Sequence, residues 1–174
     1  MIFAERGLNR AGVDSLIAEA DVAKATFYRY FPSKDDLIVA WLADSRTRWF
    51  ERVLALAESR AVDARDVVVQ VFGAAAEWLE GDDYRGCPYL NASVELSDPA
   101  GAAATAVRDT LAEIGAFLER SVAAAGYAEP ARLGRELHTL LAGSIALGVA
   151  NRSSRYALAA RDAARELLEG ATRA

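Results

Sequence analysis

Residues 13–37 read VDSLIAEADVAKATFYRYFPSKDDL. The first part repeats apolar residues at the i, i+3, i+4, i+7 spacing of one buried helical face, namely Val13, Leu16, Ile17 and Ala20. A second segment runs from Lys24 to Phe31, where Pro32 closes it because the residue before a proline resists helical dihedrals. With Gly12 at the N-cap, the stretch predicts a short helix, a tight turn and a second short helix.

The rest of the chain favours helices as well, because alanine is frequent, proline occurs at four positions and β-branched runs are scarce. Capping residues, prolines and glycines divide it into segments. We expect the tail of a helix over 2–6, then a helix of about six turns that Ser33 caps, and then a helix that starts at Asp63 and is interrupted by Gly81-Asp82-Asp83. A short helix should follow from Pro88 to about Leu96, and a longer one from Asp98-Pro99 to Gly126. Two more helices are expected, one that starts at Pro130 and a last one that Ser153 or Ser154 caps and that ends near Gly170. No strand pair stands out, so the fold class is all-α.

The chain carries few of the residues that catalysis or metal binding uses. Cys87 is the single cysteine and His138 the single histidine, which excludes an internal disulfide and a Cys/His metal cluster. The sequence also lacks Gly-x-Ser-x-Gly, a phosphate loop and paired carboxylates on a motif. We therefore expect no cofactor and no enzymatic activity. There is no signal-peptide core, and the stretch 137–150 is too short to span a bilayer, so a cytoplasmic protein without a membrane partner is expected.

Charge is distributed unevenly along the chain. The net charge is −5, which argues against non-specific coating of nucleic acid. Residues 1–34, however, hold five basic and four acidic groups, and the only two lysines, Lys24 and Lys34, both lie there. This asymmetry indicates phosphate contact by the N-terminal segment.

A helix-turn-helix motif predicts a specific function for its second helix. In this motif the second helix enters the major groove, and its exposed N-terminal side chains meet bases and phosphates. Lys24, Thr26 and Tyr28 are placed for such contacts, whereas Val22 and Phe27 are expected to face inward. Residues 28–34 read YRYFPSK, which resembles the Tyr-(Arg or His)-(Tyr or His)-Phe-x-Ser-Lys signature of the TetR family of bacterial transcriptional repressors.

This resemblance implies an N-terminal three-helix DNA-binding domain over residues 1–33 and a helical ligand-binding and dimerisation domain over 34–174. Asp21 stands where the family commonly has a turn glycine. Family members also have about ten or more residues ahead of Ile2, so we expect a truncated first helix here and a longer natural chain. DNA contact is implied for Lys24, Ala25, Thr26, Tyr28, Tyr30 and Lys34.

A second resemblance covers residues 85–95, RGCPYLNASVE, which are similar to a Gly-Cys-x-x-x-Asn-x-x-x-Glu pattern at the pocket entrance in one branch of the family. Asn91 and Glu95 share a helix face, where they either orient a polar ligand or pair locally. The aromatic candidates either line a small-molecule cavity or belong to the core. The candidate ligand-binding residues are Trp41, Phe72, Trp78, Cys87, Tyr89, Asn91, Glu95, Phe117 and His138.

The last two helices, over about 130–149 and 154–170, are expected to pair with those of a second copy as a four-helix dimer interface. The sequence thus predicts a repressor that binds a pseudo-palindromic operator as a homodimer and is released by a small-molecule inducer. The alternative is a dimeric small-molecule-binding protein on the same scaffold that has lost DNA binding.

Overall fold

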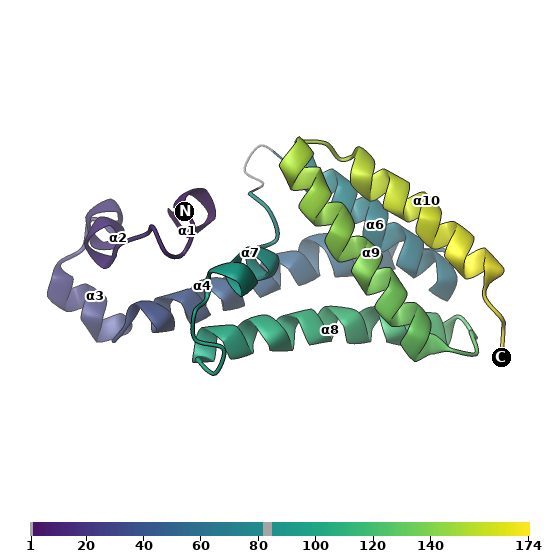
Figure 1. Cartoon of the computed structure of the whole chain (residues 1–174), viewed down its shortest axis with the longest axis horizontal. Coiled ribbons are helices and arrows are strands. Elements are labelled where there is room, and N and C mark those ends of the chain that lie inside the picture. Colours follow the sequence, from purple (N-terminus) through teal and green to yellow (C-terminus); the bar gives the residue numbers. More distant parts are fainter. Residues whose placement is uncertain (1, 82–84) are drawn as a thin grey trace. The chain divides into compact units, whose positions relative to one another are not determined.

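The computed structural model describes residues 2–81 and 85–174, so Met1, Asp82 and Asp83 of the expectations above lie outside it (Figure 1). The predicted all-α class is confirmed: the described residues form helices and no strand, and an antiparallel bridge joins Tyr127 to Arg173. The helices are α1 (Ile2–Arg6), α2 (Val13–Ala20), α3 (Lys24–Tyr30), α4 (Lys34–Trp49), α5 (Leu56–Arg60), α6 (Ala64–Leu79), α7 (Pro88–Glu95), α8 (Ala102–Ala124), α9 (Pro130–Asn151) and α10 (Arg155–Gly170).

Most of the predicted helix ends are confirmed. Asp63 caps α6 by accepting the Asp66 backbone N–H at 2.8 Å, and Pro88 and Pro130 occupy first-turn positions of α7 and α9. One expected helix continues differently, because a π-helical segment, η1 (Phe50–Ala55), joins α4 to α5.

The start predicted for α8 is wrong. The helix begins at Ala102 and not at Asp98-Pro99. Asp98 instead forms a turn: its Oδ1 accepts the Ala100 N–H at 3.0 Å, and its carbonyl oxygen accepts the Gly101 N–H at 3.3 Å. An aspartate that bonds its own backbone two residues on favours a turn over a helix start.

By packing, the chain divides into two compact units. The first unit comprises Met1–Arg46 and Cys87–Thr110, and the second comprises Thr47–Gly86 and Leu111–Ala174. This division does not coincide with the predicted domain boundary after residue 33. The predicted boundary separates the helix-turn-helix domain from the helical regulatory domain, and it stays a prediction.

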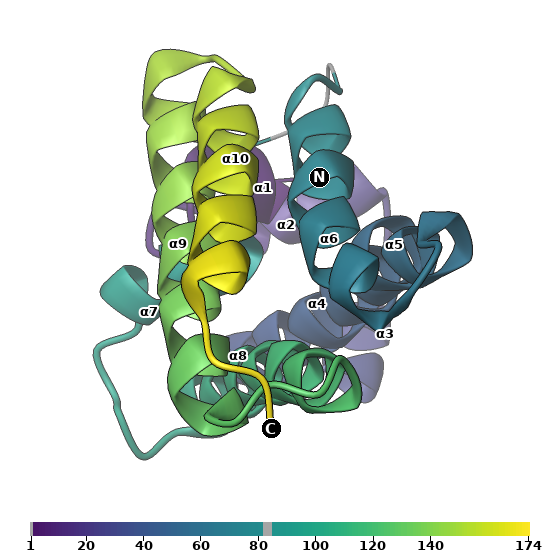
Figure 2. The same ribbon diagram turned by 90° about the vertical axis from the view of Figure 1, so that its right-hand side faces the viewer.

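The core of the second unit lies between α6, α9 and α10. Figure 2 shows α9 and α10 side by side, and α6 packs against both. Their facing side chains are apolar, and Phe72, Leu137 and Leu168 are almost completely buried. Helix α9 also approaches α8 closely at Gly134, where a Cβ would lie 2.9 Å from Cα of Glu119. Burial of this kind, at about 25 cal/mol per Å² of apolar surface, stabilises the unit.

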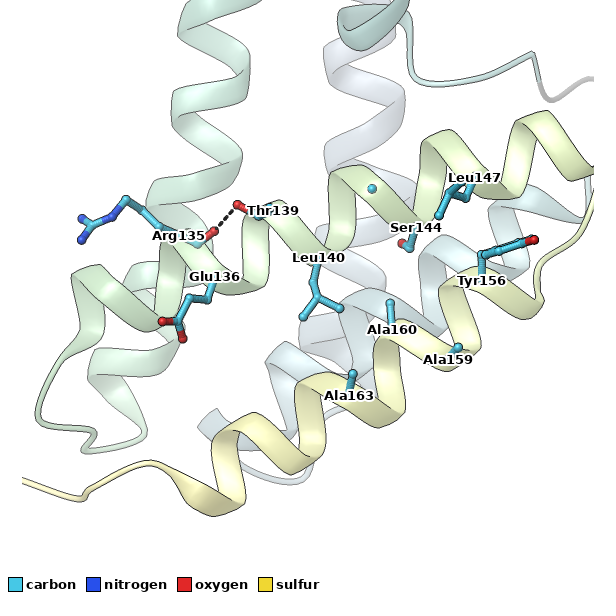
Figure 3. A pocket seen from close by; sticks show the side chains of 11 residues that line it. Arg135, Glu136, Thr139, Leu140, Ser144, Leu147, Tyr156, Ala159, Ala160 and Ala163 are labelled. Atoms are coloured by element: carbon cyan, nitrogen blue, oxygen red, sulfur yellow. Dashed lines mark hydrogen bonds between the residues drawn. The ribbon is translucent and has the colours of Figure 1, made fainter.

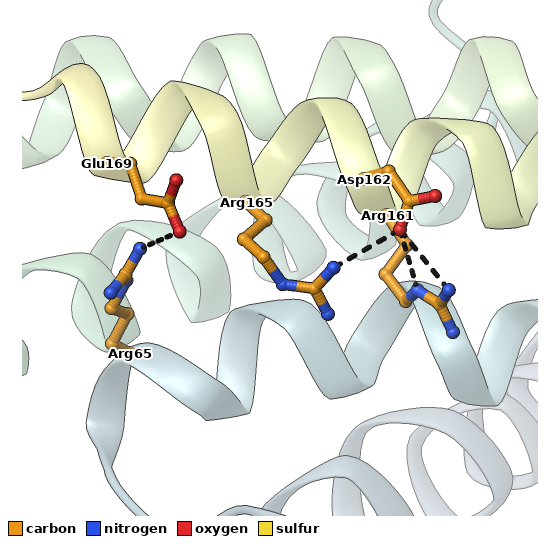
Figure 4. A network of polar contacts seen from close by, with 5 residues as sticks. All are labelled: Arg65, Arg161, Asp162, Arg165 and Glu169. Atoms are coloured by element: carbon orange, nitrogen blue, oxygen red, sulfur yellow. Dashed lines mark hydrogen bonds and ion pairs between the residues drawn. The ribbon is translucent and has the colours of Figure 1, made fainter.

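Charged side chains lie along α10 on the side that Figure 4 shows. Arg65 of α6 pairs with Glu169 at 3.2 Å, and Asp162 accepts from Arg161 at 3.2 Å and from Arg165 at 3.3 Å. Because these side chains are exposed or half-buried near the surface, each pair contributes little to stability.

Candidate nucleic-acid interface and apolar groove

The turn between α2 and α3 rests on a left-handed residue. Asp21 has φ 51° and ψ 45°, and its backbone N–H caps α2 by donating to Ala18 at 3.3 Å. Aspartate is one of the few non-glycine residues that adopt this conformation routinely. Gly12, the predicted N-cap of α2, has the extended backbone of a cap. The predicted helix, turn and helix are therefore present.

Phe27 anchors α3 and is only 6% exposed. Its ring packs against those of Tyr28 and Phe31, with centroid distances of 5.4 Å and 5.8 Å. The inward orientation predicted for Phe27 is confirmed, but that of Val22 is wrong. Val22 lies in the turn itself, directly after the left-handed Asp21, and is 38% exposed.

The side chains implied in DNA contact lie on α3 and at the first residue of α4. Tyr28 is 41% exposed and Tyr30 is 67% exposed, and the Arg29 guanidinium lies 5.1 Å from the centre of the Tyr30 ring. Lys24 and Ala25 are also exposed, whereas Thr26 and Lys34 are half-buried. Their contact with DNA stays a prediction.

Lys24 has a partner within the same segment. Its Nζ lies 3.1 Å from Oδ1 of Asp14 on α2, and both side chains are largely exposed. The hydrogen bond to Asp14 and the charge of that carboxylate raise the pKa of Lys24. The ammonium is therefore held at the start of α3, beside a carboxylate with which a phosphate would compete.

A reciprocal cap fixes the start of α4. The Ser33 hydroxyl and backbone N–H donate to Oδ2 of Asp36 at 2.6 Å and 2.9 Å, and the Asp36 N–H donates back to Ser33 Oγ at 3.1 Å. This capping box satisfies N–H groups that a helix start leaves unpaired. It also fixes the backbone of Lys34 directly after α3.

Five of the predicted ligand-binding residues fall in the first unit. Tyr89 is 1% exposed, and its hydroxyl donates to the Leu42 carbonyl oxygen at 3.1 Å. The Trp41 ring lies 5.6 Å from that of Phe3. Cys87 is buried at the N-cap of α7, and burial raises the pKa of its thiol. Asn91 is exposed, whereas Glu95 is half-buried and pairs with Asn9.

The other four predicted ligand-binding residues fall in the second unit. Phe72 is fully buried in α6, and Phe117 is buried in α8. The Trp78 ring packs on that of Trp49 at 4.8 Å. His138 of α9 lies close to α8, since a Cβ at Gly115 would be 3.0 Å from its Nδ1, and burial lowers the pKa of the imidazole. Ligand binding by these residues stays a prediction.

An open groove of about 680 Å³ lies along α9 and α10, and none of the nine predicted ligand residues lines it. Its apolar lining includes Leu140, Leu147, Tyr156 and Ala163. Figure 3 shows Leu140 directed toward the alanines of α10 across this groove. Leu147 is 51% exposed and Tyr156 is 37% exposed. The last two helices, which are expected to form the dimer interface, line this groove, but the sequence alone does not show which of their apolar residues stay uncovered.

Two further findings concern metal binding and membrane spans. In the part of the chain that the structure describes, no three His, Cys, Asp or Glu side chains are grouped so that they could hold a metal ion. Across residues 2–81 and 85–174, no helix combines the length and the apolar character that crossing a bilayer requires.

Comparison with known proteins agrees with this geometry. Residues 1–41 match the family model described as bacterial regulatory proteins, tetR family. The repressor NemR of Escherichia coli strain K12 is 27% identical over 95 residues, which are 54% of this chain and 48% of NemR. DhaR, a repressor of Mycobacterium sp. strain GP1, is 31% identical over 96 residues, 55% of this chain and 47% of DhaR. Each match therefore spans about half of the relative's length.

The similarity to a solved structure extends further. SCO4454, a TetR-family transcriptional regulator from Streptomyces coelicolor, superposes with a TM-score of 0.89 at 29% sequence identity, covering 97% of this chain and 88% of SCO4454. Fold, turn geometry and the matched motif together define a helix-turn-helix protein. Residues 1–41 are therefore similar to the DNA-binding segment of the TetR family, and the fold of the chain is similar to that of a TetR-family regulator over almost its whole length.

Proposed function

We propose that this chain is a transcriptional repressor that binds a pseudo-palindromic operator as a homodimer and is released by a small-molecule inducer. One observation carries the proposal: α3 presents Lys24, Tyr28 and Tyr30 outward on a helix that Phe27 anchors. An exposed helix face with cationic and phenolic groups at a helix-turn-helix suits a major groove and its phosphates. The relatives NemR and DhaR are repressors. The proposal includes a cytoplasmic location and no enzymatic activity.

The groove along α9 and α10 supports the homodimer. Leu147 and Tyr156 are exposed large apolar side chains that line the same open surface. Large apolar side chains that are exposed together on one surface are typical of an interaction site. A two-fold axis through it would bury the same groove from both copies as a four-helix contact.

An aromatic pair in the second unit supports an inducer site. The Trp49 indole N–H is buried and makes no hydrogen bond to any group in the described part of the chain, while its ring packs against Trp78. A buried donor without an acceptor costs free energy. A planar apolar inducer with a hydrogen-bond acceptor would supply one, and quenching of tryptophan fluorescence by a panel of such compounds tests this.

Substitutions in the α3–α4 segment test DNA binding. A duplex is first selected from a random pool with the full chain, and fluorescence anisotropy then measures its Kd. We expect Tyr28→Phe and Lys34→Ala each to weaken binding about five- to ten-fold or more, since each removes a phosphate or base contact. Unchanged affinity in both variants, with unchanged mass in solution, would contradict the assignment.

The dimer is tested at the groove. Leu147→Glu places a charge in the proposed interface and should give a monomer by light scattering. Val62→Glu is the matched control, because Val62 is 88% exposed and lies outside the groove. Equal dimer mass in both variants would contradict the proposed interface. A dimer that selects no duplex would instead favour the small-molecule-binding alternative.

A further inference from the structure

Two hydrogen bonds fasten the loop after α1 to the last residue of α7. The Asn9 backbone N–H donates to Oε2 of Glu95 at 3.0 Å, and Asn9 Nδ2 donates to the Glu95 backbone oxygen at 3.0 Å. The pair uses backbone and side chain of both residues, which lie 86 positions apart in sequence. We call it the Asn9–Glu95 clamp. It fixes the loop in one register against the end of α7.

The backbone beside the clamp is adapted to it. Gly7 has φ +80°, which favours glycine, and a Cβ there would lie 2.8 Å from Glu95 Oε2. The last carbonyl groups of a helix lack intrahelical donors, so the Asn9 amide caps α7 by binding the Glu95 carbonyl. Loop conformation and helix end are therefore fitted to each other.

A second anchor holds α7 to α4 within the same unit. The Tyr89 hydroxyl is buried and donates to the carbonyl oxygen of Leu42. The loop held by the clamp leads through Gly12 into α2, while α4 begins with Lys34 directly after α3. Through its two anchors, α7 thus contacts the segments on both sides of the α2–α3 pair.

We propose that Glu95 is a positioning residue for the DNA-binding helices, because the clamp links the docked position of α7 to the orientation of α2 and α3. Binding free energies are reciprocal, so operator binding then stabilises docked α7 as much as docked α7 favours operator binding. The inference rests on the proposed function. Of the two roles considered for Glu95, it selects local pairing over ligand orientation.

The surroundings allow the clamp to open. A hollow of about 190 Å³ with a mixed polar and apolar lining adjoins it, and Asn9, Lys34 and Glu95 are among the residues that line it. Glu95 is only half-buried, so its carboxylate can leave Asn9 without disrupting the apolar core. Lys34, a predicted phosphate contact, borders the same hollow, so clamp and DNA-contacting surface are neighbours.

The single cysteine reports on α7. Cys87 is the N-cap of that helix, it is 7% exposed, and burial raises the pKa of its thiol. A thiol reagent such as DTNB needs an accessible thiolate. At fixed pH, its rate of reaction with Cys87 therefore measures how often α7 opens.

The experiment uses the full chain and the duplex selected as above. Duplex binding should slow the reaction of wild-type Cys87 several-fold. Glu95→Gln and Asn9→Ala should each raise the rate without DNA about five-fold, weaken operator binding by a similar factor and reduce the protection by DNA, because each variant weakens one bond of the clamp. Glu58→Gln, an exposed carboxylate of α5, should leave all three quantities unchanged.

The outcomes separate the two proposals. If no duplex is selected, the proposed function fails, and an unchanged Cys87 rate in both variants then overturns the clamp as well. If a duplex is selected but leaves the wild-type rate unchanged, or if both variants keep wild-type affinity and protection, the clamp proposal is overturned. Circular dichroism checks folding. If Asn9→Ala loses helix content, the result for Glu95→Gln is the decisive one, because glutamine keeps the shape of the glutamate side chain.

Discussion

The α2–α3 pair and the α6–α9–α10 core are stabilised in different ways. Helix α2 has no buried residue and α3 has one, Phe27, whereas α6 and α9 bury seven each. The core is therefore stabilised by apolar burial. The α2–α3 pair depends instead on the left-handed Asp21, the Ser33–Asp36 capping box and the Asn9–Glu95 clamp. The lesson is that changes in the core should alter stability, and changes around α3 should alter binding.

Breaking the core should have the largest effect. Leu137 of α9 is fully buried, so Leu137→Ala should lower the free energy of unfolding by about 2–5 kcal/mol through lost burial and a cavity. Urea unfolding followed by circular dichroism measures it. Val62→Ala, at a site 88% exposed, should change stability by less than about 0.5 kcal/mol. Similar losses of unfolding free energy in Leu137→Ala and Val62→Ala would contradict the distinction between buried and exposed positions.

A smaller effect is expected where polar caps replace burial. Ser33→Ala removes the hydroxyl of the capping box and should cost about 1 kcal/mol of unfolding free energy, again measured in urea. Ser59 is the matched control, because its hydroxyl donates to the Leu56 carbonyl within its own helix. Ser59→Ala should be neutral. A neutral Ser33→Ala would show that the box does not stabilise the start of α4.

Asp14→Asn, on α2, should strengthen operator binding and so sharpen the contrast between the α2–α3 pair and the core. It removes the carboxylate that holds Lys24, so operator affinity should rise about two- to five-fold at low salt and fall more steeply with salt concentration. Anisotropy titrations at several salt concentrations measure both. Glu19→Gln, on an exposed α2 side chain, removes the same charge without touching that ion pair. An equal gain in both variants would point to net charge alone.

The smallest effect should be a pH dependence in the core. Burial lowers the pKa of His138 below its ordinary value of 6.5, so the unfolded chain takes up the proton first. Stability should therefore fall as the pH drops below about 6.5, and His138→Gln should reduce that loss. Unfolding at pH 7.5 and pH 5.5 measures the difference between the two proteins. Identical pH dependence would exclude His138 as its source.

Local signals predicted much of this molecule. Pro88 and Pro130 mark helix starts, Gly12 and Pro32 bound the motif, and the helix-turn-helix interpretation predicts that Phe27 faces inward. These features act through neighbouring residues, so the sequence alone contains the physics that determines them.

What sequence could not predict depends on distant partners. No pattern joins Asn9 to Glu95 across 86 positions, and nothing local indicates that Val22 and Leu147 stay exposed, because burial depends on which element covers a residue. The prediction of where α8 starts is wrong for a local reason, since Asp98 suits a turn as well as a helix cap. The positions of the candidate ligand-binding side chains could not be predicted from the sequence either, because they depend on how the helices pack.

The central claim is sequence-selective DNA binding through α3. It is tested most directly by fluorescence anisotropy of the full chain on the selected duplex and on a shuffled duplex of equal length, at several stated salt concentrations. We predict that near physiological salt the selected duplex binds at least about 10³-fold more tightly, a typical ratio for specific regulators. Equal affinity for the two duplexes at every salt concentration would contradict the claim.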